Sequence, residues 1–165
     1  CGAAFSKSQR NHKTPFGLEC NRPLIGPLHL GHTFKTDVLS ISFKQPEMPM
    51  SDKSFWYSLL YAILEGTSQA LGIKRQDLDG CLFPSEEGIS LILFDNVPGG
   101  AGHVKRLMDN DNFKETFESA LNRVKYCSCG LETSCYGCLR NYQNQFCHGQ
   151  LNRGKVLECL ENGFK

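Results

Sequence analysis

Four cysteines within twelve positions constrain this chain more than any other feature. They lie in the stretch "YCSCGLETSCYGCLRN" (residues 126–141) with the spacing C-x-C-x5-C-x2-C. A structural zinc ion needs four ligands in a tetrahedron, and two close pairs of thiolates on separate turns supply such a set. Gly130 and Gly137 allow the backbone conformations that a knuckle requires. The spacing therefore predicts a zinc site formed by Cys127, Cys129, Cys135 and Cys138.

Other uses of these thiols stay open at this point. Disulfides are typical of small secreted chains, yet the first residues carry no secretion signal and 165 residues are enough to bury a core. An iron–sulfur cluster is chemically possible, although this spacing is not a familiar one for it, and free thiols are the remaining alternative. Cys147 and His148 are substitute ligands, unless His148 only joins its loop to the next helix. Cys81 and Cys159 lie in apolar patterns that predict small core residues.

The pattern of apolar residues predicts a small antiparallel sheet with one central helix. Residues 34–43 alternate apolar and polar side chains, as a strand does. Residues 72–84 and 88–96 flank the turn "SEEG", which predicts a hairpin. Residues 53–73 carry a broad apolar face at helical spacing, and Ser51 or Asp52 can cap their start.

Three helices are expected in the second half of the chain. The glycine-rich turn in "VPGGAGHVKRLM" (residues 97–108) opens a short one, and a longer one follows with inward positions at Phe113, Phe117, Leu121 and Val124. A last helix is predicted with Asn152 as its cap and a buried side formed by Val156, Leu157 and Leu160. The predicted class is α+β, in which helices pack on a small antiparallel sheet and a four-cysteine zinc knuckle lies near the C-terminus.

The charge is unevenly distributed along the chain. Lys and Arg outnumber Asp and Glu six to two in residues 1–44 and six to three in 121–165, whereas acids outnumber bases twelve to six in 45–120. Basic ends fit either a nucleic-acid surface or an ordinary solvated face. Arg140, Arg153 and Lys155, with tyrosines interleaved, are the candidate nucleic-acid contacts. No apolar run is long enough to predict a membrane span, so we expect a cytoplasmic protein.

Two motifs in combination resemble the MrfA-type zinc-binding domain. "LFDNVPGGAGHVKRL" carries the family's Asp-x-x-Pro-Gly-Gly-Ala-Gly pattern, and "CSCGLETSCYGCLRNYQNQFCHGQLNRGKVLECL" carries its cysteines. The resemblance spans residues 36–160 and implies that the four cysteines named above are the zinc ligands. The family often continues with His and Leu-Asp-Arg, matched here by His148 and by Leu151, Asn152 and Arg153, so the aspartate of that pattern is replaced at Asn152.

The resemblance also implies a division of the chain. Many relatives carry a cysteine and histidine ribbon ahead of this domain, and its remnants would be Cys1, His12 and Cys20, a second metal site within residues 1–33. Residues 34–165 would then form the MrfA-type domain. Since Cys1 is not a natural initiator, we expect the chain to be cut from a longer protein.

Such domains lie at the C-terminus of superfamily 2 helicases and related proteins of DNA repair and phage defence. The resemblance therefore implies an accessory domain that braces helicase motor domains, on the same or a partner chain, or guides a DNA strand. A motor needs a Gly-rich loop ending in Gly-Lys-Ser/Thr, and "PGGAGHV" lacks the lysine, so we expect no ATP hydrolysis by this chain alone. Its glycines predict either a phosphate site or close backbone packing.

An enzyme of its own is the alternative function. A nuclease-like hydrolase would use Asp95, Glu65, Glu86 and His103 as its acids and base. This hypothesis requires that the four side chains lie together, with a metal held by carboxylates near Asp95. Asp95 is otherwise expected to be a loop anchor or a helix cap.

Overall fold

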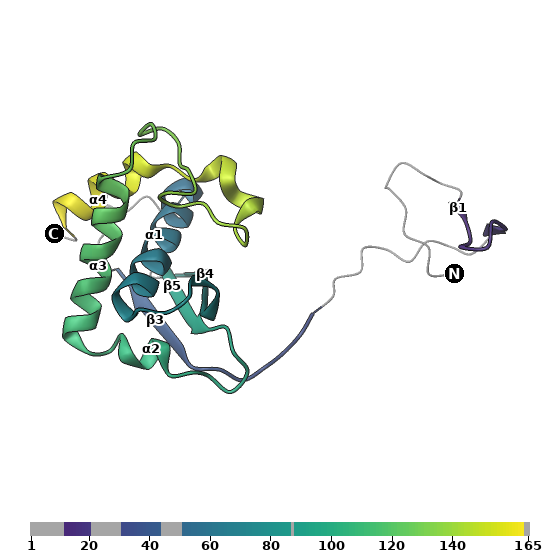
Figure 1. Ribbon diagram of the computed structural model, residues 1–165, viewed down its shortest axis with the longest axis horizontal. Helices are drawn as coiled ribbons and strands as arrows, with labels where there is room; N and C mark the ends of the chain where they lie inside the picture. The colour runs from purple at the N-terminus through teal and green to yellow at the C-terminus, as the bar shows by residue number, and fades with distance from the viewer. Residues whose placement is uncertain (1–11, 21–30, 44–50, 87, 164–165) are drawn as a thin grey trace. The chain divides into compact units, whose positions relative to one another are not determined.

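The structure, a computed structural model, describes residues 12–20, 31–43, 51–86 and 88–163 (Figure 1). The chain divides into two compact units, Cys1–Thr33 and Phe34–Lys165. In the first unit, strands β1 (His12–Lys13) and β2 (Glu19–Cys20) pair antiparallel. Their turn is closed by a hydrogen bond of 2.7 Å from the N–H of Thr14 to the carbonyl of Leu18.

Three antiparallel strands form the sheet of the second unit, in the order β3 (Val38–Ser42), β5 (Gly88–Asp95), β4 (Leu78–Ser85). Side chains alternate between the faces of a strand, so the pairing of Leu39 with Leu93 and of Ile41 with Leu91 puts apolar residues on one face. The predicted hairpin is confirmed, with Ser85 opposite Gly88 at its turn. The first part of its leading segment is a short 3-10 helix, η1 (Arg75–Asp77).

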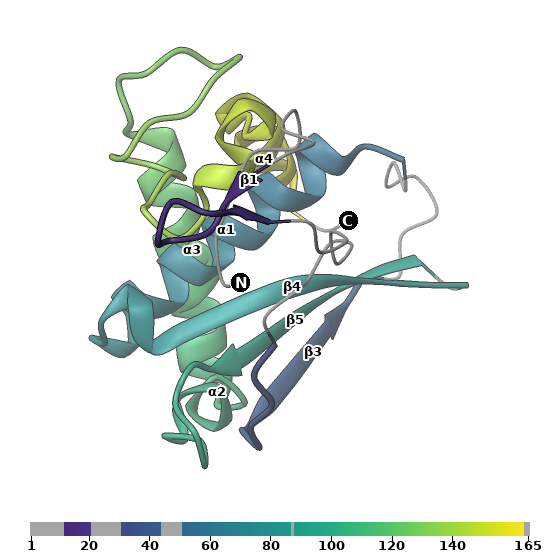
Figure 2. The same ribbon diagram turned by 90° about the vertical axis from the view of Figure 1, so that its right-hand side faces the viewer.

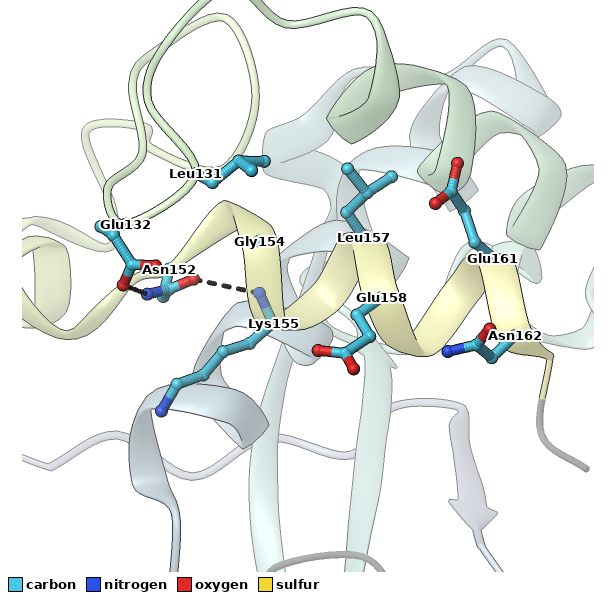
Figure 3. Close-up of a pocket in the computed structure, with 9 residues that line it drawn as sticks. All are labelled: Leu131, Glu132, Asn152, Gly154, Lys155, Leu157, Glu158, Glu161 and Asn162. Carbon is cyan, nitrogen blue, oxygen red and sulfur yellow. Dashed lines mark hydrogen bonds between the residues drawn. The ribbon is translucent and has the colours of Figure 1, made fainter.

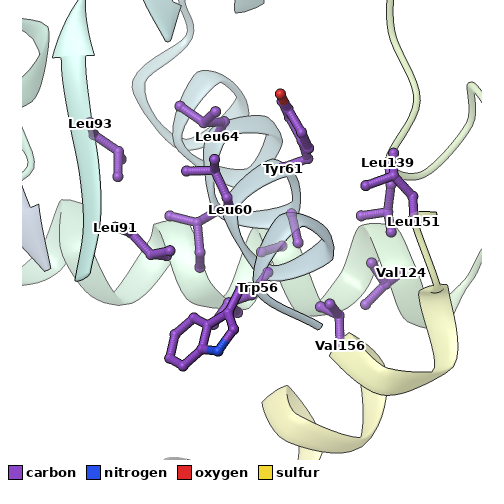
Figure 4. Close-up of a cluster of buried hydrophobic side chains, with 14 of the residues drawn as sticks. Trp56, Leu60, Tyr61, Leu64, Leu91, Leu93, Val124, Leu139, Leu151 and Val156 are labelled. Atoms are coloured by element: carbon purple, nitrogen blue, oxygen red, sulfur yellow. The ribbon is translucent and has the colours of Figure 1, made fainter. Parts of the chain in front are cut away.

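Helix α1 (Lys53–Leu71) is the centre of the fold, as the sequence predicted. Its cap is Asp52, whose Oδ1 accepts the N–H of Phe55 at 3.1 Å, and it ends at Gly72 in the left-handed conformation. Figure 4 shows why most of this helix is buried: Leu60 and Leu64 face Leu91 and Leu93 of the sheet, while other side chains face the C-terminal half of the chain. Figure 2 shows that helices cover the face of the sheet on which α1 lies.

Three further helices complete the second unit: α2 (His103–Arg106), α3 (Asn110–Lys125) and α4 (Arg153–Asn162). A second 3-10 helix, η2 (Gln145–Gln150), precedes α4. Helix α3 lies against α1 at Gly66, where a Cβ would collide with the carbonyl of Thr116. Asn152 caps α4 as predicted, since its side chain accepts the N–H of Lys155.

Several side chains that were predicted to face the core are less buried than expected. On α3, Val124 is buried, but Phe117 and Leu121 are half-buried and Phe113 is exposed. On α4, Val156 is buried, whereas Leu157 and Leu160 are only half-buried. One open groove between the two helices is lined by Phe113, Phe117, Leu121 and Leu160, and it leaves these four side chains partly uncovered.

Two of the remaining cysteines also differ from expectation. Cys81 was predicted to be a core residue, but it lies on the outer face of β4 and is exposed. Cys159 is partly buried on α4. No helix among the described residues has the length and apolar character needed to cross a membrane.

Candidate metal centre

The four cysteines of the knuckle converge. The knuckle begins directly after α3, and the four sulfur atoms all lie within 4.8 Å of one another. The Sγ of Cys127 lies 3.5 Å from that of Cys129 and 3.4 Å from that of Cys135. The Sγ of Cys138 lies 3.7 Å from that of Cys129 and 3.9 Å from that of Cys135. Two turns separated along the chain thus present their thiols to one point.

These separations fit zinc. With Zn–S bonds of about 2.3 Å, the sulfurs of a tetrahedral site stand about 3.8 Å apart. The four separations given above, 3.4–3.9 Å, bracket that value. A disulfide would require about 2 Å between sulfurs, so the geometry does not support that alternative. The four cysteines are positioned to hold a metal ion, and four thiolate ligands are a set that zinc prefers.

The pKa values of Cys127, Cys129 and Cys138 are shifted in different directions by their surroundings. A backbone hydrogen bond from Cys129 lowers the pKa of Cys127 to about 7, whereas burial raises the pKa of Cys138 to about 12. Burial also raises the pKa of Cys129. Buried thiols with a raised pKa ionise readily only beside a cation, and zinc binding replaces their protons.

The second cysteine pair sits on a tight turn. The carbonyl of Cys135 accepts the N–H groups of Cys138, Leu139 and Arg140 at 3.0–3.1 Å, and the N–H of Gly137 lies 3.3 Å from the Sγ of Cys135. Leu139, directly after the last ligand, is fully buried against the core. The turn is therefore anchored to the hydrophobic core at the end of the knuckle.

Cys147 and His148, the substitute ligands of the sequence analysis, lie outside the sulfur cluster. The Nε2 of His148 lies 3.0 Å from the carbonyl of Asn141 and 2.8 Å from the Oδ1 of Asn144. Cys147 belongs to η2 and is buried, and its thiol donates to the carbonyl of Asn144. His148 thus joins η2 to the loop directly after the knuckle, whereas the sequence analysis expected a link to the helix that follows, α4.

The glycine-rich turn after β5 is closed by Asp95. This carboxylate is fully buried and accepts the N–H groups of Ala101 at 2.7 Å, His103 at 3.0 Å and Val104 at 3.0 Å. Gly100 has a φ of +77°, and a Cβ there would lie 2.6 Å from the Oδ2 of Asp37. The turn therefore packs closely on itself, and the N–H groups that a phosphate would need are bound to an internal carboxylate.

The residues of the hydrolase hypothesis do not come together. Apart from the four cysteines, the described residues include no group of three or more His, Cys, Asp or Glu side chains that could hold a metal. Glu65 is buried and pairs with Arg123 at 3.0 Å, while Glu86 is exposed on the hairpin turn. Asp95 is the loop anchor described above, and the Nδ1 of His103 is buried without a hydrogen-bond partner.

The three candidate nucleic-acid contacts have different surroundings. Arg140 is half-buried, and its Nε donates to the Oγ of Ser134 at 2.9 Å. Lys155 pairs with Asp52, whose pKa this hydrogen bond lowers. Arg153 is only 6% exposed and donates to the carbonyls of Val124 and Cys129, which does not suit a phosphate contact.

The second predicted metal site falls largely outside the described residues. Cys1 is not described, and nor is the side chain of His12. The β1–β2 register places position 12 directly opposite Cys20. A metal site at these three residues therefore stays a prediction.

A shallow pocket of about 390 Å³ lies beside the knuckle, between residues 131–132 and α4 (Figure 3). Three carboxylates and Lys155 line it together with Leu131 and Leu157, and Asn152 bridges Glu132 to the first turn of α4. No thiol or imidazole lines this pocket, so it is separate from the metal centre.

Sequence reasoning missed the polar residues that support the knuckle. Asn144 is fully buried and donates to the carbonyl of Leu139 at 2.8 Å, and its Oδ1 accepts the N–H of Asn141. Arg123 donates to the carbonyl of Cys138 at 2.8 Å. The "NYQN" stretch directly after the last cysteine was the available signal, because asparagines commonly bind backbone groups in turns.

Comparison with known proteins finds similarity to a zinc-binding domain. The family model of the MrfA Zn-binding domain matches residues 59–139. The Druantia protein DruE of Escherichia coli is 27% identical over 183 residues, which cover 93% of this chain and 10% of DruE.

Among solved structures, the crystal structure of the DUF1998 helicase MrfA bound to DNA matches with a TM-score of 0.58 at 20% identity. This match covers 82% of this chain and 18% of that one and shows a shared fold. The chain thus spans about a tenth of DruE and less than a fifth of MrfA. Residues 59–139, which include all four cysteines of the knuckle, match the family model of the MrfA Zn-binding domain.

Proposed function

We propose that this chain is the zinc-stabilised accessory domain of an ATP-dependent nucleic-acid helicase, in DNA repair or phage defence. The observation that carries the proposal is the convergence of four cysteine sulfurs within 4.8 Å. Four thiolates fill the tetrahedron of a zinc ion and leave no open position for a substrate or a water. Such an ion contributes folding free energy, and no reaction step is assigned to it.

The relatives support a helicase context. The structure that shares this fold is described as a DUF1998 helicase bound to DNA, and DruE is a Druantia protein. The present chain has no Gly-Lys-Ser/Thr loop, and Asp95 occupies the N–H groups of its glycine-rich turn. We therefore assign ATP hydrolysis to motor domains on the same chain or on a partner chain, which this domain braces.

Activity measurements on two proteins test this proposal. The isolated chain should show only background ATP hydrolysis and background nuclease activity. A helicase that carries this domain should lose strand separation when the domain is deleted, and should recover part of it when the domain is added back in trans. ATP hydrolysis by the isolated chain, or full strand separation without it, would contradict the accessory role.

Guiding a DNA strand is a second candidate function, and exposed aromatic side chains favour it. Tyr126, Tyr136 and Tyr142 around the knuckle are 79%, 62% and 83% exposed. Arg140 lies between the last two in sequence and is half-buried. Bases stack on exposed aromatic rings while cations contact phosphates, which suits a single strand. Binding of the isolated domain to a labelled single strand tests this candidate.

A further inference from the structure

Backbone carbonyls of two knuckle cysteines are each bound by an arginine from a different helix. Arg123, in the last turn of α3, donates from its Nε to the carbonyl of Cys138 at 2.8 Å. Arg153, the first residue of α4, donates from its Nη2 to the carbonyl of Cys129 at 2.6 Å. One arginine therefore holds each of the two cysteine pairs.

Arg153 is built into the fold. Its Nη1 donates to the carbonyl of Val124, the last buried residue of α3, at 2.7 Å, so one guanidinium joins the end of α3 to the first cysteine pair. The N–H groups of Arg153 and Gly154 also donate to the carbonyls of Thr133 and Leu131, at 2.9 and 2.8 Å. The first turn of α4 is thus fastened along the loop that follows Cys129.

Arg123 is held from its other side by a carboxylate. Its Nη2 lies 3.0 Å from the Oε2 of Glu65, which is buried on the central helix α1. Glu65 also pairs with Arg75 at 3.4 Å and accepts the amide of Asn141 at 3.2 Å. The orientation of the Arg123 guanidinium is therefore fixed by α1, and the second cysteine pair is tied to the core through it.

These contacts matter for metal binding because the two cysteine pairs lie on separate turns. The affinity for zinc depends on how well the four sulfurs are placed, and groups behind the ligands help to set that placement. Arginine suits this task because its planar guanidinium can donate to two acceptors at once, whereas a lysine is a single flexible point charge. Neither guanidinium contacts a sulfur in the described contacts, so both act through the backbone.

We propose that Arg123 and Arg153 are positioning residues that hold the two halves of the zinc-ligand set in register, so that the affinity of the knuckle for zinc depends on them. Glu65 holds Arg123 for this task. The inference rests on zinc binding by the four cysteines. It assigns to Arg153 a role inside the protein in place of the predicted contact with nucleic acid.

Chelator competition on the full chain tests the proposal. The zinc content of the wild-type chain is first measured by elemental analysis, and zinc transfer to a chromophoric chelator is then followed at equilibrium. Arg153→Lys keeps the charge but replaces the two nitrogens that bind the two carbonyls with a single ammonium, so we expect zinc affinity to fall about 10–100-fold, as for other residues behind metal ligands. Arg123→Lys should lower the affinity in the same direction.

Two control variants separate positioning from general stability. Arg106→Lys removes an arginine that donates to a backbone carbonyl outside the knuckle, that of Leu71 at 3.2 Å. Leu93→Ala leaves a cavity under the sheet and lowers the melting temperature without touching the knuckle. Both should keep wild-type zinc affinity at a temperature at which every variant is folded.

Three outcomes are informative. If the wild-type chain holds no zinc, the proposed zinc site fails and this inference fails with it. If wild type holds one zinc and Arg153→Lys binds it equally well, only the positioning role is overturned. The positioning role is also overturned if Leu93→Ala lowers the melting temperature as much as Arg153→Lys does and weakens zinc binding to the same extent.

Discussion

The glycine-rich turn and the cysteine knuckle both bring several polar groups together, but the groups in the two segments differ in kind. Each is an irregular segment beside a helix end, and each brings several polar groups to one point. In the glycine-rich turn, the groups are backbone N–H donors, and the buried carboxylate of Asp95 accepts three of them. In the knuckle, the groups are four thiols that face one another, with no cationic side chain among their described contacts.

The difference determines what each segment needs from outside. The chain supplies its own anion to the glycine-rich turn, so this turn is complete without a ligand. The knuckle has no internal cation, and its buried thiols with a raised pKa need one to ionise. Of these two motifs, the glycine-rich turn is thus closed by the protein itself, and the knuckle requires a metal ion.

Removing one thiolate should have the largest effect. Cys135→Ser leaves the zinc ion with three good ligands, so we expect a loss of at least about 3 kcal/mol in unfolding free energy. The melting temperature should fall by roughly 6–12 °C. A chelator should lower the melting temperature of wild type toward that of the variant and change the variant little.

The matched control for this variant is Cys81→Ser, because Cys81 is exposed on β4 and outside the knuckle. That substitution should change the unfolding free energy by no more than about 0.5 kcal/mol. If Cys135→Ser melted with wild type, the knuckle would be peripheral to stability and the contrast with the glycine-rich turn would be lost.

Changing the internal anion should have the next largest effect. Asp95→Asn keeps the shape of the side chain but replaces one carboxylate oxygen with an NH2 group. A backbone N–H that this oxygen accepts in the wild type then faces a donor and loses its hydrogen bond. We therefore expect a loss of about 2 kcal/mol in unfolding free energy. Because the turn is closed by the protein alone, this loss should be the same with and without chelator. Thermal unfolding under both conditions measures it.

Asp109→Asn is the comparison for that substitution. Asp109 also accepts backbone N–H groups, from Asp111 at 3.0 Å, but it is exposed at the cap of α3. Asp and Asn are nearly equivalent as exposed caps, so a change of only a few tenths of a kcal/mol is expected. Equal losses at Asp95 and Asp109 would mean that the burial of Asp95 is unimportant.

Close packing of the glycine-rich turn can be tested at a finer level. Gly100→Ala adds a Cβ that would lie 2.6 Å from the Oδ2 of Asp37 and forces a left-handed φ on a residue with a side chain. Gly102→Ala has the same φ of +77°, but a Cβ there meets nothing within 4 Å. We expect about 1 kcal/mol of destabilisation at Gly102 and up to about 1 kcal/mol more at Gly100. Equal effects in denaturant unfolding would show that backbone conformation alone requires the glycines.

The sequence predicted the parts of the fold that depend on local chemistry. The hairpin turn after Ser85 and the cap at Asn152 were placed from short signals, and the cap of α1 was narrowed to Ser51 or Asp52, of which Asp52 is the one observed. Cysteine spacing likewise predicted which sulfurs converge, because paired ligands on neighbouring turns are a local arrangement.

The rest depended on partners that are distant in sequence. Helical periodicity placed Phe113 on the apolar side of α3, but burial also requires a neighbour at that height, and the groove there is open. Arg153 looked like a surface cation, because nothing near it in sequence shows that Val124 and Cys129 present their carbonyls to it. Local signals thus place the ends of helices and strands, and the packing between them decides which charges are buried.

Nucleic-acid binding by the exposed tyrosines should be the smallest effect measured. Arg153 is buried and Lys155 is paired to Asp52, so few of the described cations around the knuckle remain for phosphates, and the isolated domain should bind a single strand weakly. For at most about four contacts, the logarithm of the affinity should fall with that of salt with a slope no steeper than about −3. Tyr142→Ala should weaken binding by about 1 kcal/mol if a base stacks on that ring, measured by fluorescence anisotropy.

The control for this measurement must remove charge without touching the tyrosines. Arg140→Ala and Lys114→Ala each remove one positive charge, but Arg140 lies between Tyr136 and Tyr142 in sequence, whereas Lys114 lies near the start of α3 and is 78% exposed. Binding along the knuckle predicts a loss for Arg140→Ala that exceeds the loss for Lys114→Ala. Equal losses would indicate attraction by net charge alone, and no binding at low salt would leave this surface to protein contacts. Either result would mean that the knuckle stabilises the fold and does not bind nucleic acid, which agrees with a zinc ion whose four positions are all filled by thiolates.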